Sequence, residues 1–439
     1  MKLPRVPRFY GWRIVGAGGV IQMLHSGLLM QAFTNYSVLL REEFGWSATM
    51  ISAAFSMTRA ESGFLGPIQG WAIDRFGPRN VIRVGTVLFG VGFMLFSQIQ
   101  TPMQFFGFYF LVAFGSSLGG FLSITTAIVN WFAAKRSMAL AFSQAGFAVG
   151  GLLTPVIVYS LTNFGWRGTA FASGVIVLAV GLPLSQVIHH RPEDIGEHVD
   201  GIDPALTADS EDGDDLRKRE DLTVREALRT PAFWLISLGH SASLLVVGAV
   251  MVHLSLHLTE SLDFSLQQAS FVGGALPLMQ LSGQILGGLF GDRFTKRYVV
   301  VVAMGGHMAG LLMLAFATNV LMVWAFVPLH GIAWGLRGPL MQAMRADYFG
   351  RTHFGTIMGF SSMIVMLGMI AGPLFAGILR DQTDSYKMAF AILAILAGLG
   401  SAFFYFAAPP KPPARPRHEA DAQPLTAGAA PDPAGGSGP

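Results

Sequence analysis

The chain has 439 residues, of which 52% are hydrophobic and only 13% are charged, and its formal net charge is +3. Soluble domains carry roughly 25% charged residues, so this composition excludes a soluble globular protein and indicates a chain that crosses a membrane many times. The lack of cysteine excludes disulfides, iron–sulfur clusters, thiol nucleophiles and thiolate zinc sites, and so small a net charge gives no sign of nucleic-acid binding.

Twelve apolar stretches are long enough to span a membrane. A helix needs about 20 apolar residues to cross about 30 Å of hydrocarbon. The first stretch follows Lys2, Arg5 and Arg8 as in a signal peptide, but its length and the eleven stretches after it indicate a retained helix. The predicted spans are 13–40, 48–74, 80–99, 103–131, 137–162, 168–189, 231–258, 267–291, 298–318, 320–346, 353–379 and 386–408.

Lysine and arginine are unevenly divided between the two sides that these spans define. With the N-terminus in the cytoplasm, 23 of the 29 basic residues fall on the cytoplasmic side and four on the other, leaving Arg59 and Arg337 inside spans. Cytoplasmic loops of membrane proteins carry such an excess. We therefore expect a multi-pass protein of the plasma (inner) membrane with both termini in the cytoplasm.

The sequence repeats at an offset of 218 residues. Gly70 to Phe76 returns as Gly288 to Phe294, and the same offset carries Pro155 to Pro373. Because each copy has an even number of spans, both enter the membrane in the same direction. The predicted fold is an all-α membrane protein of twelve helices in two parallel six-helix repeats. Its expected parts are an N-terminal arm (1–12), a first bundle (13–189), a cytoplasmic linker (190–230), a second bundle (231–408) and a disordered tail (409–439).

A charged motif ends the second span and recurs after the eighth. Asp74 has Arg75 and Arg79 beside it, so ion pairs between helices can form in one arrangement and break in another. The alternative is a topological anchor, in which the basic residues hold the loop inside. The predicted conformational gate consists of Gly70, Asp74, Arg75, Gly77, Arg79, Asp292 and Arg293.

These features together resemble the major facilitator superfamily. Twelve spans in two sets of six, a long central loop and the Gly-x-x-x-Asp-Arg motif in both halves carry the resemblance, which covers residues 9 to about 408. The second copy of the motif lacks the Gly-Pro of the first. The resemblance implies a carrier whose first, fourth, seventh and tenth helices line a central cavity.

A narrower resemblance links the chain to bacterial monocarboxylate porters and oxalate/formate exchangers. It rests on Phe9–Trp12, Glu43–Trp46, Trp131–Arg136 and Arg191–Asp194. It implies secondary active transport of a small organic anion, of monocarboxylate or dicarboxylate type, coupled to protons or to a counter-substrate. Better-known members place basic ligands in the eighth and eleventh helices, whereas Phe271–Gly291 here contains no Lys, Arg or His.

Arg337 is the best candidate for binding a substrate carboxylate. It lies ten residues before Asp347 in the tenth span, about 15 Å along the helix and near the midplane. A charge there costs at least about 2.5–3.5 kcal/mol and should face a partner or a water-filled path. A salt bridge between helices, or bonds to backbone carbonyls, would be the structural alternative.

Arg59 and Glu61 lie together in the outer half of the second span. Their side chains point about 200° apart, so they cannot share a cavity. Arg59 is a second substrate-binding candidate, or else part of a buried pair or gate on the stripe of Gly63, Gly66 and Gly70. Glu61 is the candidate for proton coupling, although an ordinary ion pair would explain it equally well.

Several histidines fall inside spans. His25 and His330 are expected to line the cavity as substrate-binding or proton-relay groups, or to be neutral structural rings. His253 and His257 share a helix face at metal-ligand spacing, but without nearby carboxylates we expect no metal and no cofactor.

The carrier is therefore the leading functional class. Efflux of lipophilic drugs or other small molecules is the alternative carrier, and a membrane sensor that does not transport is the alternative of another class. A nucleotide-driven pump is disfavoured because no Gly-x-x-x-x-Gly-Lys-Ser/Thr motif occurs and the central linker is too short for a nucleotide-binding domain, and we expect no enzyme activity. The expected partners are a small organic anion, a proton or counter-substrate and the lipid bilayer, and we expect a monomer.

Overall fold

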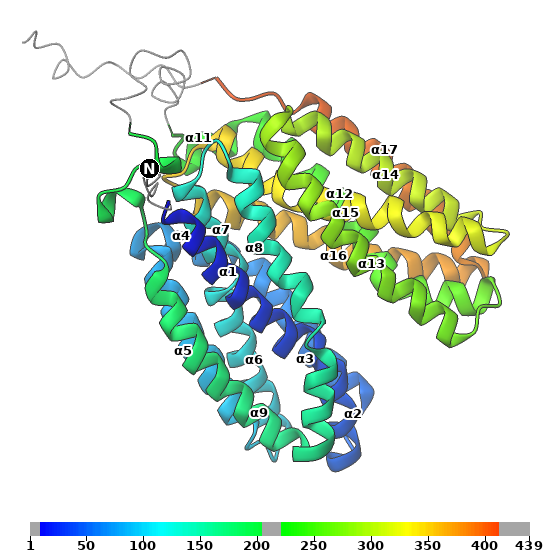
Figure 1. The fold of residues 1–439 in the computed structure, drawn as a ribbon. Helices are drawn as coiled ribbons and strands as arrows, with labels where there is room; N and C mark the ends of the chain where they lie inside the picture. The colour runs from blue at the N-terminus through cyan, green and yellow to red at the C-terminus, as the bar shows by residue number, and fades with distance from the viewer. Residues whose placement is uncertain (1–8, 204–220, 412–439) are drawn as a thin grey trace, which may run out of the picture.

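The computed structural model describes residues 9–203 and 221–411, and every regular element in these ranges is helical (Figure 1). Most of the predicted arm, the middle of the predicted linker and nearly all of the predicted tail lie outside the described residues. The helices form the twelve predicted spans, and each span begins and ends within four residues of its predicted position.

The N-terminal half contains six spans, four of which combine more than one helical piece. Its elements are α1 (Gly11–His25), the π-helical turn η1 (Ser26–Gln31) and α2 (Phe33–Phe44); α3 (Ala48–Phe64) and α4 (Gly66–Phe76); α5 (Pro78–Phe96); α6 (Pro102–Gly119) and α7 (Phe121–Trp131); and α8 (Arg136–Gly151) with α9 (Thr154–Val187), which supplies the end of the fifth span and all of the sixth.

Breaks in these helices occur where the sequence places glycine or proline. Gly165 divides α9 into two spans with a φ of +70°, a left-handed conformation that favours glycine. Gly77 takes a φ of +80° between α4 and α5, and Pro78 then occupies the first turn of α5, where the missing N–H costs no helical hydrogen bond. The short turn places the charged end of α4 directly beside α5.

The C-terminal half contains six continuous helices, one for each span. They are α12 (Pro231–Ser261), α13 (Leu266–Arg293), α14 (Lys296–Ala315), α15 (Val320–Phe349), α16 (Phe354–Thr383) and α17 (Tyr386–Phe406). Within the described residues, nine helical stretches meet the length and apolarity expected of a membrane span. One of them, Arg136–Val187, holds two spans, and the α3–α4 pair and α13 complete the twelve.

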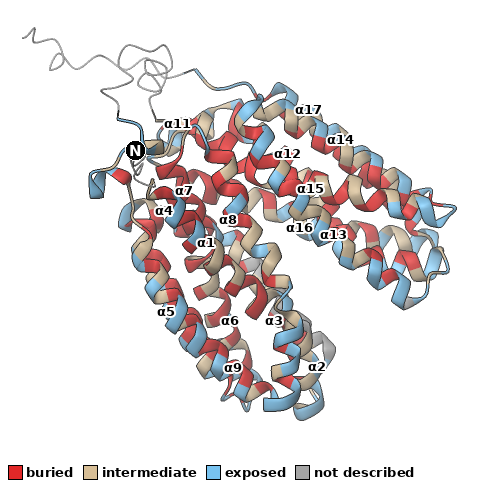
Figure 2. Ribbon diagram, viewed as in Figure 1, coloured by how far each residue is buried: buried red, intermediate tan, exposed pale blue. Residues whose placement is uncertain are grey.

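The two bundles meet at one end and diverge toward the other (Figure 1). The meeting end also carries the described N-terminus and residues 190–203, and we call it the linker end. Buried residues run through both bundles and into the region where they meet (Figure 2). A small apolar cluster there joins Ile73 and Val129 of the first half to Ala346, Phe354 and Met358 of the second.

The described flanks of the linker are folded onto the bundles. They form η2 (Pro192–Ile195), η3 (Val199–Gly201) and α11 (Val224–Arg229). Asp200 accepts backbone hydrogen bonds from Ala133 and Ala134 of the first half, at 3.1 and 2.8 Å. Asp221 accepts them from Arg351 and Thr352 of the second half, at 3.1 and 2.7 Å. The first flank also reaches the second half, where Glu193 pairs with Arg351 at 2.8 Å.

Candidate functional site

Asp74 caps a helix of the opposite half. Its carboxylate accepts the backbone N–H groups of Gly355 and Thr356 at 2.9 and 2.7 Å, and the Thr356 hydroxyl at 2.6 Å. These N–H groups belong to the first turn of α16, whose own preceding residue, His353, makes no side-chain cap. The first N–H groups of a helix lack partners within it and favour negative charge. Asp74 therefore supplies a missing cap across the contact between the halves.

Asp292 does the same in the reverse direction. At the end of α13 it accepts the backbone N–H groups of Ser137 and Met138 at 2.8 and 3.0 Å. These open α8 in the first half, and Lys135 before them makes no side-chain cap. Donors and acceptors of both caps are related by the same 218-residue offset. The repeated motif therefore forms two reciprocal contacts, in which each half caps one helix of the other.

Glycines allow the backbones to approach closely beside these caps. A Cβ atom on Gly70 would lie 2.1 Å from the carbonyl oxygen of Gly355, and one on Gly66 would lie 2.8 Å from that of Gly359. The equivalent contact of Gly288 is looser, at 3.0 Å from Ala141 Cβ and Met138 Cα. Side chains at Gly70 would therefore block the contact between α4 and α16.

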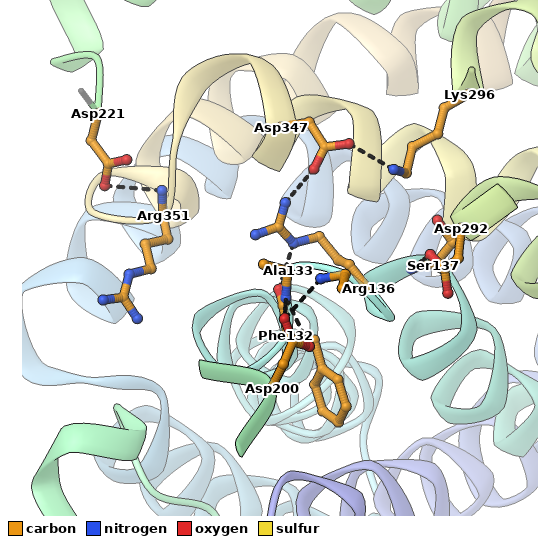
Figure 3. Close-up of polar contacts among 11 residues, drawn as sticks. Phe132, Ala133, Arg136, Ser137, Asp200, Asp221, Asp292, Lys296, Asp347 and Arg351 are labelled. Carbon is orange, nitrogen blue, oxygen red and sulfur yellow. Dashed lines mark hydrogen bonds and ion pairs between the residues drawn. The ribbon is translucent and has the colours of Figure 1, made fainter. Parts of the chain in front are cut away.

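Ion pairs add to the contacts between the halves at the linker end. Asp347 on α15 pairs with Arg136 of α8, and also with Lys296 of its own half at 2.8 Å (Figure 3). Arg351 donates to the carbonyl oxygen of Asn130 in the first half at 3.1 Å. Arg136 and Asp347 join the two halves directly, with side chains 10% and 19% exposed. These residues were not among the predicted gate residues.

Asp74 makes no ion pair with Arg75 or Arg79 in this conformation, although the sequence analysis considered such pairs. Arg79 donates to Gln186 of α9 at 3.0 Å, inside its own half. Arg75 and Arg293 are exposed and make no hydrogen bond or ion pair with another described residue. Gly77 serves the turn between α4 and α5. The two aspartates and the glycines face the other half, and the arginines do not.

Arg337 is buried in α15 without a hydrogen-bond partner among the described residues. It is 1% exposed, and its Nε lies fully shielded. The charged or titratable groups in electrostatic range are Arg345, His240, His307 and His330, all in the second half. In this conformation a substrate cannot reach the guanidinium from solvent.

Other unsatisfied polar groups surround this part of α15. A Cβ on the next residue, Gly338, would lie 2.9 Å from Oε1 of Gln144, which belongs to α8 of the opposite half. Gln144 is buried, and its Nε2 has no partner among the described residues. Gln342 Oε1 on α15 and Gln284 Oε1 on α13 are in the same situation. We call Gln144, Gln284, Arg337 and Gln342 the buried polar cluster.

Arg345 is a second buried cation, which the sequence analysis counted on the cytoplasmic side although it falls one residue before the end of the predicted span 320–346. Because α15 continues to Phe349, Arg345 lies inside it and is 1% exposed. Its guanidinium is fully engaged, contacting Ser361 Oγ at 3.0 Å, the carbonyl oxygen of Met341 at 3.1 Å and His240 Nδ1 at 3.1 Å. It binds neighbouring helices, whereas Arg337 does not.

Glu61 is buried among neutral donors. Gln69 Nε2 and Ser62 Oγ donate to its two oxygens at 3.1 Å each, and Gln69 also donates to Ser117 of α6 at 2.7 Å. None of these contacts involves a base, so the carboxyl can carry a proton without breaking an ion pair there. Arg59 lies in α3, but its side chain lies outside the described residues.

The predicted histidines are packed as structural rings. His25 contacts the carbonyl oxygen of Ser116 at 3.1 Å, and its ring lies 4.5 Å from that of Phe89. His330 is fully buried and contacts His307 of α14 at 3.1 Å. Both rings are buried in this conformation, as the structural alternative expects, and their role in substrate binding or proton relay stays a prediction. Within the described ranges no three His or acidic side chains gather as metal ligands.

Two six-helix bundles that cap each other's helices at one end define a membrane carrier of the two-repeat type. A sequence model of the Major Facilitator Superfamily matches residues 18–256 and 236–433. The chain belongs to this family, which confirms the predicted twelve-helix, two-repeat fold.

Individual relatives place the chain near the predicted group. It is 23% identical over 375 residues to the "Probable sulfoacetate transporter SauU" of Cupriavidus necator, covering 83% of this chain and 86% of that one. It is 24% identical over 390 residues to the "Oxalate:formate antiporter" of Oxalobacter formigenes, covering 86% and 87%. The solved structure of the proton:xylose symporter XylE shares the fold, with a TM-score of 0.70 at 16% identity over 91% of this chain and 96% of that one.

Proposed function

We propose that this chain is a secondary active transporter that moves a small organic anion by alternating access, with the linker end in the cytoplasm of an inner-membrane protein. The family and its two relatives support this proposal, since sulfoacetate, oxalate and formate are all small carboxylate-bearing anions. The conformation closed at the linker end is one of the two that alternating access requires.

Arg337 is the observation that carries the choice of an anion. A buried guanidinium without a counter-ion costs several kcal/mol in an apolar interior, and no carboxylate of the described residues contacts it. A planar carboxylate would offset that cost with two parallel hydrogen bonds. Gln144 brings the opposite half to the next residue of α15, so a ligand between them would contact both halves.

The anion reaches Arg337 only after α15 and α8 separate, because Arg337 is 1% exposed when the linker end is closed. Substrate binding is thereby linked to the transition between conformations. Glu61, which has neutral partners, is the proposed proton carrier if transport is coupled to protons. Exchange against a second anion would leave Glu61 dispensable.

Substituting each of the two buried arginines in turn distinguishes a residue that binds substrate from one that stabilises the fold. Arg337→Gln should abolish uptake of short carboxylates into proteoliposomes while leaving the thermal midpoint unchanged or raised, because no hydrogen bond is lost. Arg345→Gln should lower the midpoint, since three contacts are broken, at about 0.5–1.5 kcal/mol or more each. Arg337→Lys should retain part of the uptake.

The opposite result would reject the proposal. Full uptake in Arg337→Gln, or transport of amphipathic cations instead of carboxylates, would favour efflux of other small molecules, because a buried positive charge repels cations. Carboxylate binding without any flux in the wild-type chain would favour a sensor.

A further inference from the structure

A basic pocket lies at the linker end of the first half. Its volume is about 510 Å³, and it is formed by the end of α4, the start of α5 and the segment after α9. Its lining includes Arg75, Phe76, Arg79, Arg83, His189 and His190. None of these side chains takes part in the helix caps or in the buried polar cluster.

The arginines of this pocket are not neutralised. Arg79 and Arg83 lie one turn apart on α5, and each donates its Nη2 to the same oxygen, Oε1 of Gln186, at 3.0 Å for Arg79. One neutral amide oxygen cannot balance two guanidinium charges. In the described part of the chain neither arginine pairs with a carboxylate, and the Nε of each is buried without a partner.

The remaining polar lining adds little negative charge. Among the described residues, Asp194 is the one carboxylate of the pocket, and it accepts the backbone N–H of Arg191 at 3.0 Å. Burial lowers the pKa of His189 and of His190, and the charge of Arg79 lowers the pKa of His189 further, against the opposing effect of Asp194. Both rings are therefore neutral near pH 7, and each can donate one N–H to an anion.

Apolar side chains border the cations. Phe76 lines the pocket and is 55% exposed, and its ring meets that of Trp71 edge-on at 5.7 Å. Trp71 and Val84 are each 54% exposed. Tryptophan is enriched at the level of lipid headgroups, so the pocket combines an anion-binding interior with a rim suited to acyl chains.

We propose that this pocket binds the phosphate group of an anionic phospholipid from the leaflet at the linker end. Arg79 and Arg83 hold the phosphate oxygens, Arg75 closes the rim, and the acyl chains lie against Phe76 and Trp71. Guanidinium groups suit phosphate because they donate two parallel hydrogen bonds, and basic pockets beside membrane helices suit anionic headgroups. A free phosphate would use the same cations but leave the aromatic rim unused.

Native mass spectrometry of the full chain in detergent tests this proposal with phosphatidylglycerol, phosphatidylcholine and inorganic phosphate. The wild-type chain should retain phosphatidylglycerol about tenfold better than phosphatidylcholine. Inorganic phosphate at millimolar concentration and constant ionic strength should not displace the lipid. These two measurements need no variant, so they remain informative if a substitution impairs folding.

The repeat provides a matched control for the residues. Arg75→Gln with Arg79→Gln should remove the preference for phosphatidylglycerol. The equivalent pair 218 residues later, Arg293→Gln with Arg297→Gln, removes the same charge from the same end, where Arg297 donates to Tyr298 Oη at 2.8 Å and neither arginine lines the basic pocket. That control should change lipid retention less than about twofold. Equal losses in both pairs, no preference in the wild-type chain, or displacement by free phosphate would each overturn the proposal.

Discussion

The two ends of the bundles use polar contacts in different ways. At the linker end they run between the halves, through Asp74 and α16, Asp292 and α8, and the Arg136–Asp347 pair. At the far end they stay within one half, as in Glu43 with Arg167 and Glu260 with Arg380. Contacts between halves must break when the carrier switches, whereas contacts within a half move with it. The halves are therefore joined at the linker end in this conformation, and we propose that this end is the gate.

The closed gate should depend most strongly on close backbone approach. Gly70→Ala places a Cβ 2.1 Å from the Gly355 carbonyl oxygen, so α4 and α16 must separate. Overpacking of this kind costs about 2 kcal/mol, which shifts the conformational equilibrium about thirtyfold toward opening at the linker end. Because the chain has no cysteine, spin labels on Met103→Cys and Leu321→Cys can report closure of the far end by a shorter distance.

The repeat supplies the graded controls for that substitution. Gly288→Ala should shift the label distance less, because its nearest contacts, Ala141 Cβ and Met138 Cα, lie at 3.0 Å and need to move by only a few tenths of an ångström. Gly107→Ala should have no effect, since nothing lies within 4 Å of its added Cβ. A larger effect at Gly288 than at Gly70 would contradict this account of the gate.

The two aspartate caps should differ in strength. Asp74→Asn weakens three hydrogen bonds and Asp292→Asn weakens two. Charge-assisted bonds contribute about 1.5–3 kcal/mol, so each variant should favour opening at the linker end, Asp74→Asn the more. The same spin-label distance measures both.

Thr356→Val isolates the extra bond of the Asp74 cap. It removes the hydroxyl donor and leaves both backbone N–H donors of α16 in place, so its effect should equal most of the difference between the two aspartate variants. Equal shifts for Asp74→Asn and Asp292→Asn, with none for Thr356→Val, would show that the hydroxyl contributes nothing to the gate.

Sequence periodicity predicted the spans and the repeat because hydrophobic length and local motifs are properties of neighbouring residues. It also singled out Asp74 and Asp292, which both make contacts between the halves in the structure, while their role as a gate stays a prediction. Their partners could not be found in the same way, because these are backbone N–H groups of helices 281 and 155 residues away. The 218-residue offset relates the two caps to each other, but it does not reveal which helix either aspartate contacts.

The burial of several polar residues could not be predicted from the sequence, for a different reason. Arg345 was counted with the cytoplasmic residues because it lies at the predicted end of its span, where composition cannot locate a helix end to within one turn. Gln144 and Gln342 carry no charge, so their sequence pattern did not distinguish them from other polar residues in spans. Their burial without partners emerges only when two distant helices are packed together.

Loss of an ion pair at the far end should change the stability of the protein and not its conformational equilibrium. Glu43 lies beyond the predicted span 13–40, and hydrogen bonds from Trp166 and then Arg167 lower the pKa of its carboxyl below its usual value of 4.5. Its contribution to stability is therefore present above about pH 4.5 and is lost as the pH falls through the lowered pKa. With Glu43 and Arg167 43% and 41% exposed, the pair contributes under about 1 kcal/mol.

Glu43→Gln should thus lower the thermal midpoint slightly at pH 7 and match the wild-type chain in strong acid. The Met103–Leu321 label distance should not change, because Glu43 and Arg167 move as parts of one bundle. Glu260→Gln, at the corresponding end of the second half, should behave alike, since its partner Arg380 also lies in that half. A shortened label distance in either variant would mean that far-end pairs resist closure, and the contrast between the two ends would then fail.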